Sequence, residues 1–455
     1  MEQTKQMTGN KMESMPIRQL VLSMSIPIAI SMLIQALYNF VDSVFVANYS
    51  DQALLAVSLC YPIQTIIVAF AVGTAAGFNT VLSRSLGAKQ KQKADQIVLH
   101  GLFLSIVNGL VFALLGWFGS EWFMGLFTQS AQVISQGVIY LRVCTLMCTC
   151  IFIQITYERI LQAAGDAMGN MIMQGVGALI NIILDPIFIY GWFGFPAMGI
   201  LGAAVATVTG QVIAMLTGIW IVQKKIHIFD IHPTQFKLSP HLIKEIYQVG
   251  IPAILMQSIM SFMSLAMNAV LGVFSEVAIS AFNVVSKLQQ IVYMIVSGIT
   301  NALIPITAYN YGAANKQRVL DGIRFSLLIA TVVAACGTVL FELFASQFLT
   351  LFGHDANMLA IATPALRIVS LSMIFAAITM VLCAAYQAAG KPKDSLVITL
   401  IRQIILLLPL VWVFAMTFGI QQCWWAYLVA EGAGLVYALV HWRKLQNNLP
   451  DKTKA

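Results

Sequence analysis

Two aspartates stand inside long apolar stretches of the sequence, where an ionised side chain is costly. Asp42 lies nine residues before Asp51, and Asp185 lies six residues before Gly191. With a helical rise of about 1.5 Å per residue, they would lie about 13 Å and about 9 Å below one surface of a membrane. An ionisable residue at such a depth is a candidate functional site. Two carboxylates that meet in a low dielectric cannot both stay ionised easily, so we expect this pair to bind and release a small cation.

Other oxygen-bearing side chains share helix faces with these aspartates. Tyr38 precedes Asp42 by four residues, so both face the same way on a helix. Asn181 precedes Asp185 by the same spacing, and Thr207 offers a further oxygen. A proton needs only one suitable carboxylate, whereas Na+ needs several oxygen atoms held together. We therefore favour H+ as the bound ion and keep Na+ as the alternative.

The composition of the chain indicates which elements must hold these residues. Of 455 residues, 59% are hydrophobic and only 9% are charged, against about 25% charged in a soluble domain. Apolar runs of roughly 20 residues recur, the length at which a helix crosses a hydrocarbon core of about 30 Å. Open sheets are excluded from lipid because their backbone groups would lack partners. The sequence therefore predicts an all-α integral membrane protein.

Twelve transmembrane helices are predicted, six in each half of the chain. The first segment is too long for the core of a signal peptide and lacks a small-residue cleavage pattern, so we expect it to be retained. The approximate ranges are 17–47, 54–80, 95–118, 132–157, 168–190, 199–223, 242–273, 278–304, 319–344, 357–380, 394–417 and 423–441.

Basic residues predict the orientation, because Lys and Arg are retained on the cytoplasmic side of short loops. They occur near both ends of the chain and in alternate connections, one of which is assigned Arg159. Both termini are therefore expected in the cytoplasm, and the protein in the inner or plasma membrane. The net charge of +7 reflects this loop bias, so we expect no nucleic-acid partner.

Motifs for enzymatic chemistry are missing from the sequence. It contains no P-loop, His-Glu metal motif or nucleophile elbow, which argues against an enzyme. Cys144, Cys148 and Cys150 are crowded, but no histidine lies nearby, so we interpret them as apolar filler rather than metal ligands. We expect no cofactor and no metal beyond the coupling ion, H+ or Na+.

The two halves of the sequence repeat each other at an offset of 225 residues, almost without gaps. Because each repeat holds an even number of helices, both copies start on the same side and the repeats are parallel. Two such repeats form bundles around a central cavity, and rocking them gives alternating access. We expect a first lobe at 1–223, a linker at 224–241 and a second lobe at 242–455. Matching pairs include Ile26-Pro27 with Ile251-Pro252, Gly87-Ala88 with Gly312-Ala313, and the Gln-Ala-Ala-Gly runs at 162–165 and 387–390.

The repeat also bears on the two aspartates. A carboxylate that only clamps the helices of a shared scaffold should more often survive in both copies. Both aspartates and the neighbouring asparagine fall on apolar residues instead, which favours ion coupling over the alternative of a structural clamp. The matches are Asp42 with Met267, Asp185 with Leu410 and Asn181 with Leu406.

Short motifs along nearly the whole chain resemble those of the multidrug and toxic compound extrusion (MATE) family. Each motif is modest alone, but together their order and spacing are a strong signal. They are Ser25-Ile26-Pro27, Asn39-Phe40-Val41-Asp42, Ser85-Leu86-Gly87-Ala88-Lys89, Gln162-Ala163-Ala164-Gly165-Asp166, Asn181-Ile182-Ile183-Leu184-Asp185-Pro186 and Met198-Gly199-Ile200-Leu201-Gly202-Ala203-Ala204.

This resemblance implies two six-helix lobes in a V shape, with export of organic, often cationic, compounds by exchange for inward H+ or Na+. It also implies that Asp42, Asn181 and Asp185 of the first lobe form the cation or proton site. Another branch of the family uses acids in helices seven and ten. Here helix seven has no acid beyond Glu245 at its start, and helix ten has none, so the chain departs from that branch.

Arg402 and Glu431 are charged residues within the second lobe. They lie about 12 Å and about 15 Å from the cytoplasmic ends of helices eleven and twelve. Their similar depths predict an ion pair between adjacent helices, which we expect to stabilise the lobe rather than to couple transport.

Contacts to the transported compound are harder to predict. Six polar residues at membrane depth are candidates to line the cavity, and each suits a hydrogen bond between helices about equally well. We expect small organic molecules and the lipid bilayer as partners, and a monomer as the working unit. The candidates are Gln35, Asn39, Gln64, Gln257, Asn283 and Lys287.

An alternative function is a flippase or exporter of a lipid-linked or other amphipathic precursor. That function would need several cationic side chains in the cavity to meet a pyrophosphate, and Lys287 is the single candidate. A membrane enzyme or receptor is the third possibility, without a motif in its favour. The favoured hypothesis is a cation-coupled exporter of drugs and toxic compounds that works by rocking its lobes.

Overall fold

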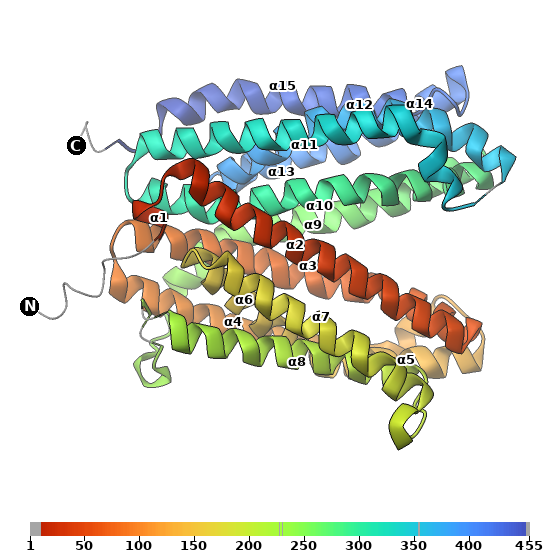
Figure 1. The fold of residues 1–455 in the computed structure, drawn as a ribbon, viewed down its shortest axis with the longest axis horizontal. Coiled ribbons are helices and arrows are strands. Elements are labelled where there is room, and N and C mark those ends of the chain that lie inside the picture. Colours follow the sequence, from red (N-terminus) through yellow and green to blue (C-terminus); the bar gives the residue numbers. More distant parts are fainter. Residues whose placement is uncertain (1–10, 227, 230, 354, 452–455) are drawn as a thin grey trace, which may run out of the picture. The chain divides into compact units, whose positions relative to one another are not determined.

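The computed structural model describes residues 11–226, 228–229, 231–353 and 355–451, and every regular element in these ranges is a helix (Figure 1). The predicted all-α architecture is confirmed. The first half forms α1 (Lys11–Ser14), α2 (Ile17–Tyr49), α3 (Asp51–Gly87), α4 (Lys91–Gly125), α5 (Ala131–Leu146), α6 (Cys148–Ala163), α7 (Ala167–Tyr190), η1 (Trp192–Gly194) and α8 (Ile200–Lys225). The second half forms η2 (Pro233–Gln235), α9 (Pro240–Gly272), α10 (Glu276–Gly312), α11 (Lys316–Thr350), α12 (Ala356–Ala388), α13 (Pro392–Leu400), η3 (Ile401–Ile405), α14 (Leu407–Phe418) and α15 (Trp425–Asn447).

The predicted twelve membrane helices are confirmed. Ten segments of the described chain are long and apolar enough to span a membrane, with the run from Pro392 to Phe418 counted as one. The pair α5 and α6, bent by 45°, makes an eleventh. The predicted twelfth helix corresponds to α15, which carries the charged Glu431 and is not among these eleven segments.

One residue used for the orientation lies elsewhere than expected. The predicted fourth helix ends at residue 157, but α6 continues to Ala163. Arg159 therefore lies within a helix and is buried, so its assignment to a loop is wrong. The next helix, α7, begins after Asp166, whose carboxylate accepts the N–H of Gly169 and caps its first turn.

The internal repeat is visible in the bounds of the helices. α3 and α10 begin at residues 51 and 276 and end at residues 87 and 312, so both bounds differ by 225. α4 and α11 keep the same offset at both ends. Two differences interrupt the match: the bend after Leu146 has no counterpart in the continuous α12, and the π-helix η3 has none in the unbroken α7.

The chain forms two compact units, and two helices begin in one unit and end in the other. Unit 1 comprises α1 and residues 30–250, whereas unit 2 comprises residues 15–29 and the chain from Ile251 onward. In unit 1, the start of α9 is bound by an ion pair of 3.0 Å between Lys93 and Glu245. In unit 2, Arg318 Nη2 donates to the carbonyl of Met15 at 3.0 Å. The lobe limits at 223 and 242 stay a prediction.

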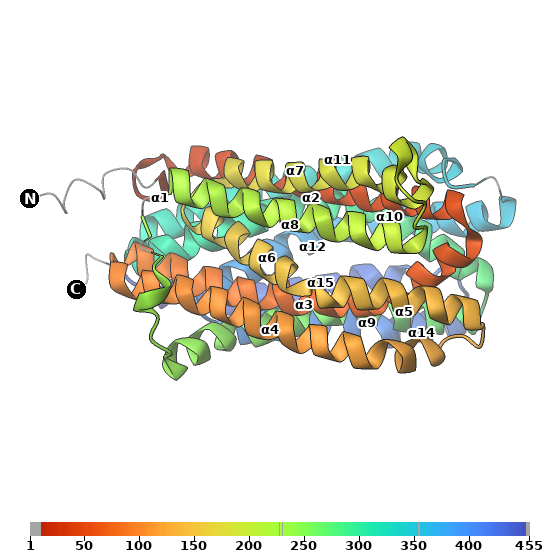
Figure 2. The same ribbon diagram turned by 90° about the horizontal axis from the view of Figure 1, so that it is seen from below.

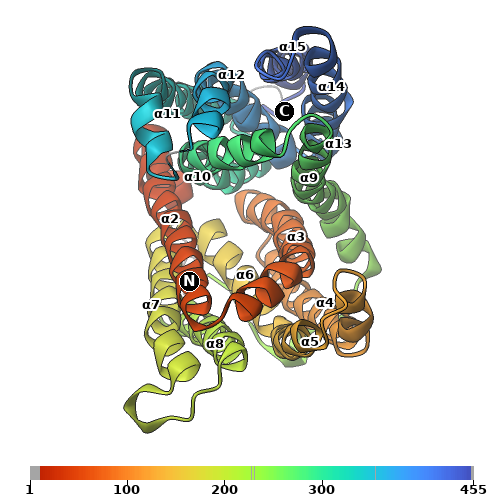
Figure 3. The same cartoon turned by 90° about the vertical axis from the view of Figure 1, so that its right-hand side faces the viewer.

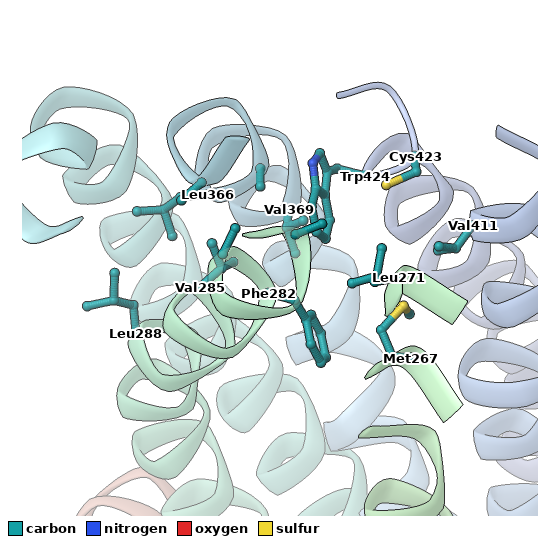
Figure 4. Packing of buried hydrophobic residues seen from close by; sticks show 14 of the residues in the cluster. Met267, Leu271, Phe282, Val285, Leu288, Leu366, Val369, Val411, Cys423 and Trp424 are labelled. Carbon is teal, nitrogen blue, oxygen red and sulfur yellow. The ribbon is translucent and has the colours of Figure 1, made fainter. Parts of the chain in front are cut away.

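Each unit has its own apolar packing. In unit 1, α7 lies beside α8, and α6 contacts α3, α4 and α8 (Figures 2 and 3). In unit 2, α10, α11 and α12 pack against one another. One buried cluster of unit 2 gathers Met267, Phe282, Val369, Val411 and Trp424 (Figure 4).

Candidate cation-binding site

Asn181, Asp185 and Thr207 meet between α7 and α8 in unit 1. Asn181 Nδ2 donates to Asp185 Oδ1 at 3.5 Å and to Thr207 Oγ1 at 3.4 Å. Asp185 is fully buried and Asn181 is 2% exposed. The amide group of Asn181 therefore holds the carboxylate of one helix turn and the hydroxyl of the neighbouring helix together, as the spacing of four residues predicts.

Close packing of glycines places Thr207 next to Asn181. A Cβ atom at Gly210 would lie 2.8 Å from the carbonyl oxygen of Gly177 and 3.1 Å from Cβ of Asn181. Only a residue without a side chain fits there, so α8 approaches the α7 backbone closely. This approach brings a hydroxyl from α8 within reach of an amide on α7.

α2 brings Tyr38 and Asp42 to the same place. The charges of Asp42 and Asp185 interact, and the Tyr38 hydroxyl interacts with both carboxylates. Gln35 donates a hydrogen bond to Tyr38, so this cavity candidate lies beside the site. The hydroxyl of Tyr190 at the end of α7 donates to the carbonyl of Phe45 at 2.7 Å and ties α7 to α2.

Three buried oxygen atoms of this cluster have no hydrogen-bond partner in the described chain. They are Asp42 Oδ1, Asn181 Oδ1 and Asp185 Oδ2. No lysine or arginine among the described residues forms an ion pair with either aspartate. Buried acceptors without donors are costly, so the cluster is suited to a proton or a small hard cation that would satisfy them.

Tyr140 on α5 is a further member that the sequence interpretation missed. Gln64 Nε2 donates to the Tyr140 hydroxyl at 3.1 Å, and this hydroxyl interacts with the charge of Asp42. Gln64, a cavity candidate, thus reaches the aspartates through Tyr140. The repeat contains the signal that could have found it, because Tyr140 matches Ala365 in the second half.

Unit 2 fills the corresponding place with apolar side chains. Met267, the counterpart of Asp42, is fully buried in the cluster of Figure 4. Leu406 and Leu410, the counterparts of Asn181 and Asp185, pack against the same cluster. Among the described residues, this candidate site therefore occurs in the first repeat alone.

Arg402 and Glu431 form a buried ion pair in unit 2. Arg402 Nε and Nη2 both donate to Glu431 Oε1, at 3.1 and 2.7 Å. The second oxygen, Oε2, has no partner among the described residues. The role of this pair in stability stays a prediction.

The structure places the remaining cavity candidates neither at the aspartate site of unit 1 nor at the Arg402–Glu431 pair of unit 2. Asn39, Gln257 and Lys287 are exposed, and Asn283 is partly buried. Nothing in the described chain binds their side chains together, so their contact with a transported compound stays a prediction.

Comparison with known proteins gives consistent matches. The MatE family model matches residues 27–187 and 252–413, two segments that start 225 positions apart. The multidrug export protein MepA of Staphylococcus haemolyticus is 26% identical over 439 residues, 96% of each chain. MepA of Staphylococcus aureus strain NCTC 8325 is 25% identical over 430 residues, 94% of each chain.

Solved structures agree with these matches. An outward-facing multidrug resistance MATE transporter of the MOP superfamily aligns with a TM-score of 0.90 at 25% identity, covering 97% of this chain and 99% of its own. A MOP superfamily transporter from Pyrococcus furiosus, with a binding pocket of reversed polarity, has a TM-score of 0.90 at 24% identity, with coverage of 97% and 98%. The second match supports the fold alone.

Proposed function

The chain belongs to the MatE family, the multidrug and toxic compound extrusion transporters, and from this premise we propose that it exports organic, often cationic, compounds across the plasma membrane in exchange for an inward cation. It is a multi-pass membrane protein and a transporter rather than an enzyme. The MepA relatives are multidrug export proteins, which supports the proposed substrate class.

The coupling site in this proposal is the cluster of Asp42, Asn181 and Asp185. The observation that carries it is the set of three buried oxygen atoms without hydrogen-bond donors in unit 1. A bound cation satisfies these atoms and removes the repulsion between two carboxylates. Without the cation, the ionised pair attracts a cationic compound.

Exchange follows from this competition. An external cation binds the aspartates and displaces the compound outward, and rocking of the lobes then exposes the site to the cytoplasm. Loss of the cation restores the charged pair, which receives the next compound. A proton serves this cycle with the two carboxylates alone, and we favour it. Na+ serves it if Tyr38 and Thr207 join Asn181 as ligands.

Purified transporter in proteoliposomes tests the ion and the site together. Export of a fluorescent cationic dye is measured with an inward proton gradient in Na+-free buffer, and then with a Na+ gradient at equal pH. We expect full export with protons alone. Asp185→Asn should abolish gradient-driven export, while Glu121→Gln, an exposed acid of the same unit, should not. Uphill export by Asp185→Asn at the normal rate would disprove this site.

A further inference from the structure

A second polar cluster in unit 1 is centred on Glu158 of α6. Its carboxylate accepts hydrogen bonds from Gln162 Nε2 and Gln174 Nε2, each at 2.9 Å. Gln174 Oε1 in turn accepts from Gln154 Nε2 at 3.1 Å. The links join α6 to α7 through amide groups, which can hold the carboxylate in either charge state.

Glu158 has no direct cationic partner in the described chain. Arg159 Nη1 donates instead to Gln162 Oε1 at 2.8 Å, so the guanidinium is separated from the carboxylate by one amide. Asn79 Nδ2 of α3 shares the same acceptor at 3.4 Å. An ion pair that served only to hold helices together would place the two charges in contact, as Arg402 and Glu431 do in unit 2.

Several atoms in and beside this cluster are buried without a partner. Gln154 Oε1 and Arg159 Nε have none within the described residues, although both side chains are more than nine-tenths buried. Asn170, which is 1% exposed, leaves both polar atoms of its amide group unpaired. Native proteins pair such atoms with water or a ligand. The cluster is therefore suited to a polar, exchangeable ligand.

α7 connects this cluster with the aspartates. Asn170, Gln174, Asn181 and Asp185 follow one another at spacings of four, seven and four residues, which places them on one helix face. Gln174 lies eleven residues from Asp185, a rise of about 16 Å. Glu158 lies near the end of α6 that precedes α7, so the two carboxylate sites lie towards opposite ends of one helix.

In the described part of the second repeat, the carboxylate of this cluster and most of its amide groups have no counterpart, although Gln162 is matched by Gln387. At the counterpart positions, Ser395 Oγ donates to the carbonyl of Cys383 at 2.8 Å, and Thr399 Oγ1 donates to the carbonyl of Ser395 at 2.9 Å. Small hydroxyl side chains thus donate to backbone carbonyls there, without a charge. The matches at the offset of 225 are Gln154 with Thr379, Glu158 with Cys383, Asn170 with Ser395 and Gln174 with Thr399.

We propose that Glu158 is a second station for the coupling cation, which receives it from the Asp42–Asp185 cluster and releases it at the end of unit 1 where α6 passes into α7. This inference rests on the proposed function. For a proton, an O–H bond breaks at an aspartate, water carries the proton, and an O–H bond forms at Glu158. The O–H bond at Glu158 then breaks, the proton passes to bulk water, and the Glu158 carboxylate is restored.

Among the described residues, no charged group on the helices packed around α6 bonds to the Glu158 carboxylate. The only cation in the cluster is Arg159, and no charged side chain of α3, α4, α5, α7 or α8 bonds to the carboxylate in the described structure. The charged and histidine groups on those helices are Asp51, Arg84, Lys91, Lys93, Asp95, His100, Glu121, Arg142, Asp185, Lys224 and Lys225.

The test compares Glu158→Gln with Asp185→Asn and the surface control Glu121→Gln in three assays. Dye binding is measured in detergent across cation concentrations, and exchange of dye for dye is measured without a gradient. Net dye export under the proton gradient is measured in H2O and D2O. In Glu158→Gln, binding and exchange should stay within about twofold of wild type because the sites are distant. Net export should fall about tenfold, with a changed solvent isotope effect.

The outcomes separate the two proposals. Normal net export by Glu158→Gln overturns the second station and leaves the aspartate site standing. Equal losses of binding, exchange and melting temperature overturn it as well, because they indicate a structural role. Cation-dependent export by Asp185→Asn refutes the proposed coupling site, whatever Glu158→Gln does. If Glu158→Gln does not fold, Glu158→Asp and Glu158→Cys are compared instead. Glu158→Asp keeps a carboxylate, so the proposal requires that its net export be closer to wild type than the net export of Glu158→Cys.

Discussion

The two units carry their buried charges at different positions of the repeat and neutralise them differently. Arg402 and Glu431 correspond to Gly177 and Ala206, which adjoin Asn181 and Thr207 in unit 1. Among the described residues, the buried carboxylates of Asp42 and Asp185 in unit 1 form no ion pair, whereas unit 2 has a carboxylate bound at 2.7 Å by a guanidinium. The cation of unit 2 is part of the chain and cannot leave. If the proposed cation site is right, the duplicated scaffold holds an exchangeable ion in one copy and a permanent one in the other.

The backbone also departs from the repeat at this position. The π-helix η3 spans Ile401–Ile405 and includes Arg402, while the matching stretch of α7 is regular α-helix. A π-turn inserts an extra residue and reorients the neighbouring side chains. The backbone therefore differs between the two repeats at the same residue, Arg402, where the charge differs.

The largest expected effect comes from breaking the ion pair of unit 2. Glu431→Gln leaves the buried guanidinium without its counter-charge, at a cost of about 3–5 kcal/mol. We expect a lower melting temperature in detergent and poor expression. The double variant Arg402→Leu/Glu431→Leu removes both charges and should recover much of the loss. An inactive Glu431→Gln of normal stability would instead make this pair part of transport.

Removing a charge from unit 1 should have the opposite effect on stability. Asp185→Asn replaces a buried carboxylate that lacks a cationic partner, so the free energy of unfolding should be unchanged or higher. Transport driven by the cation gradient should nevertheless be lost. Thermal unfolding and dye export of the same preparation measure both quantities. A fall in stability comparable to that of Glu431→Gln would remove the contrast between the units.

Packing between α7 and α8 provides a test of intermediate size. A methyl group at Gly177 would lie 2.8 Å from Cβ of Ala214 and 2.9 Å from the carbonyl of Gly210, so Gly177→Ala must separate the helices. We expect a cost of about 1–3 kcal/mol and weaker cation binding, as Asn181 moves from Thr207. Gly175→Ala is the control on the same helix, because its nearest neighbour is Ile34 Cδ1 at 4.0 Å. Equal effects at both positions would contradict this explanation.

The smallest effect is expected at Tyr140. Tyr140→Phe deletes the hydroxyl that binds Gln64 beside Asp42, a loss of about 1 kcal/mol. The cation concentration for half-maximal export should shift severalfold. Tyr386→Phe serves as the control in unit 2, because the Tyr386 hydroxyl also forms one hydrogen bond, to the carbonyl of Ala438 at 2.7 Å. It should cost similar stability but leave the cation dependence unchanged, and a shift there would show that the effect is not specific to unit 1.

The helices and the repeat were predictable because they depend on local apolar length and on matches at one fixed offset. Asp42 and Asp185 were predictable as a pair because charges are rare and conspicuous inside apolar segments. Tyr140 was not predicted, since its hydroxyl bonds to Gln64, a residue 76 positions away in the sequence. Glu158 was not predicted, since its amide partners become visible only when α6 and α7 pack together. Arg159 was misplaced because a helix that continues past its apolar run carries no hydropathy signal. The π-helix likewise depends on tertiary contacts that no periodicity records.

The sharing of α2 and α9 between the units has a consequence for synthesis at the ribosome. Residues 15–29 emerge and insert first, yet their unit begins again only at Ile251. Met15 receives its hydrogen bond from Arg318, and Arg18 lies 6.0 Å from the ring of Phe325. About 300 further residues must therefore be translated before the start of the first helix can form these contacts. In a first half synthesised alone, that segment would lack these partners.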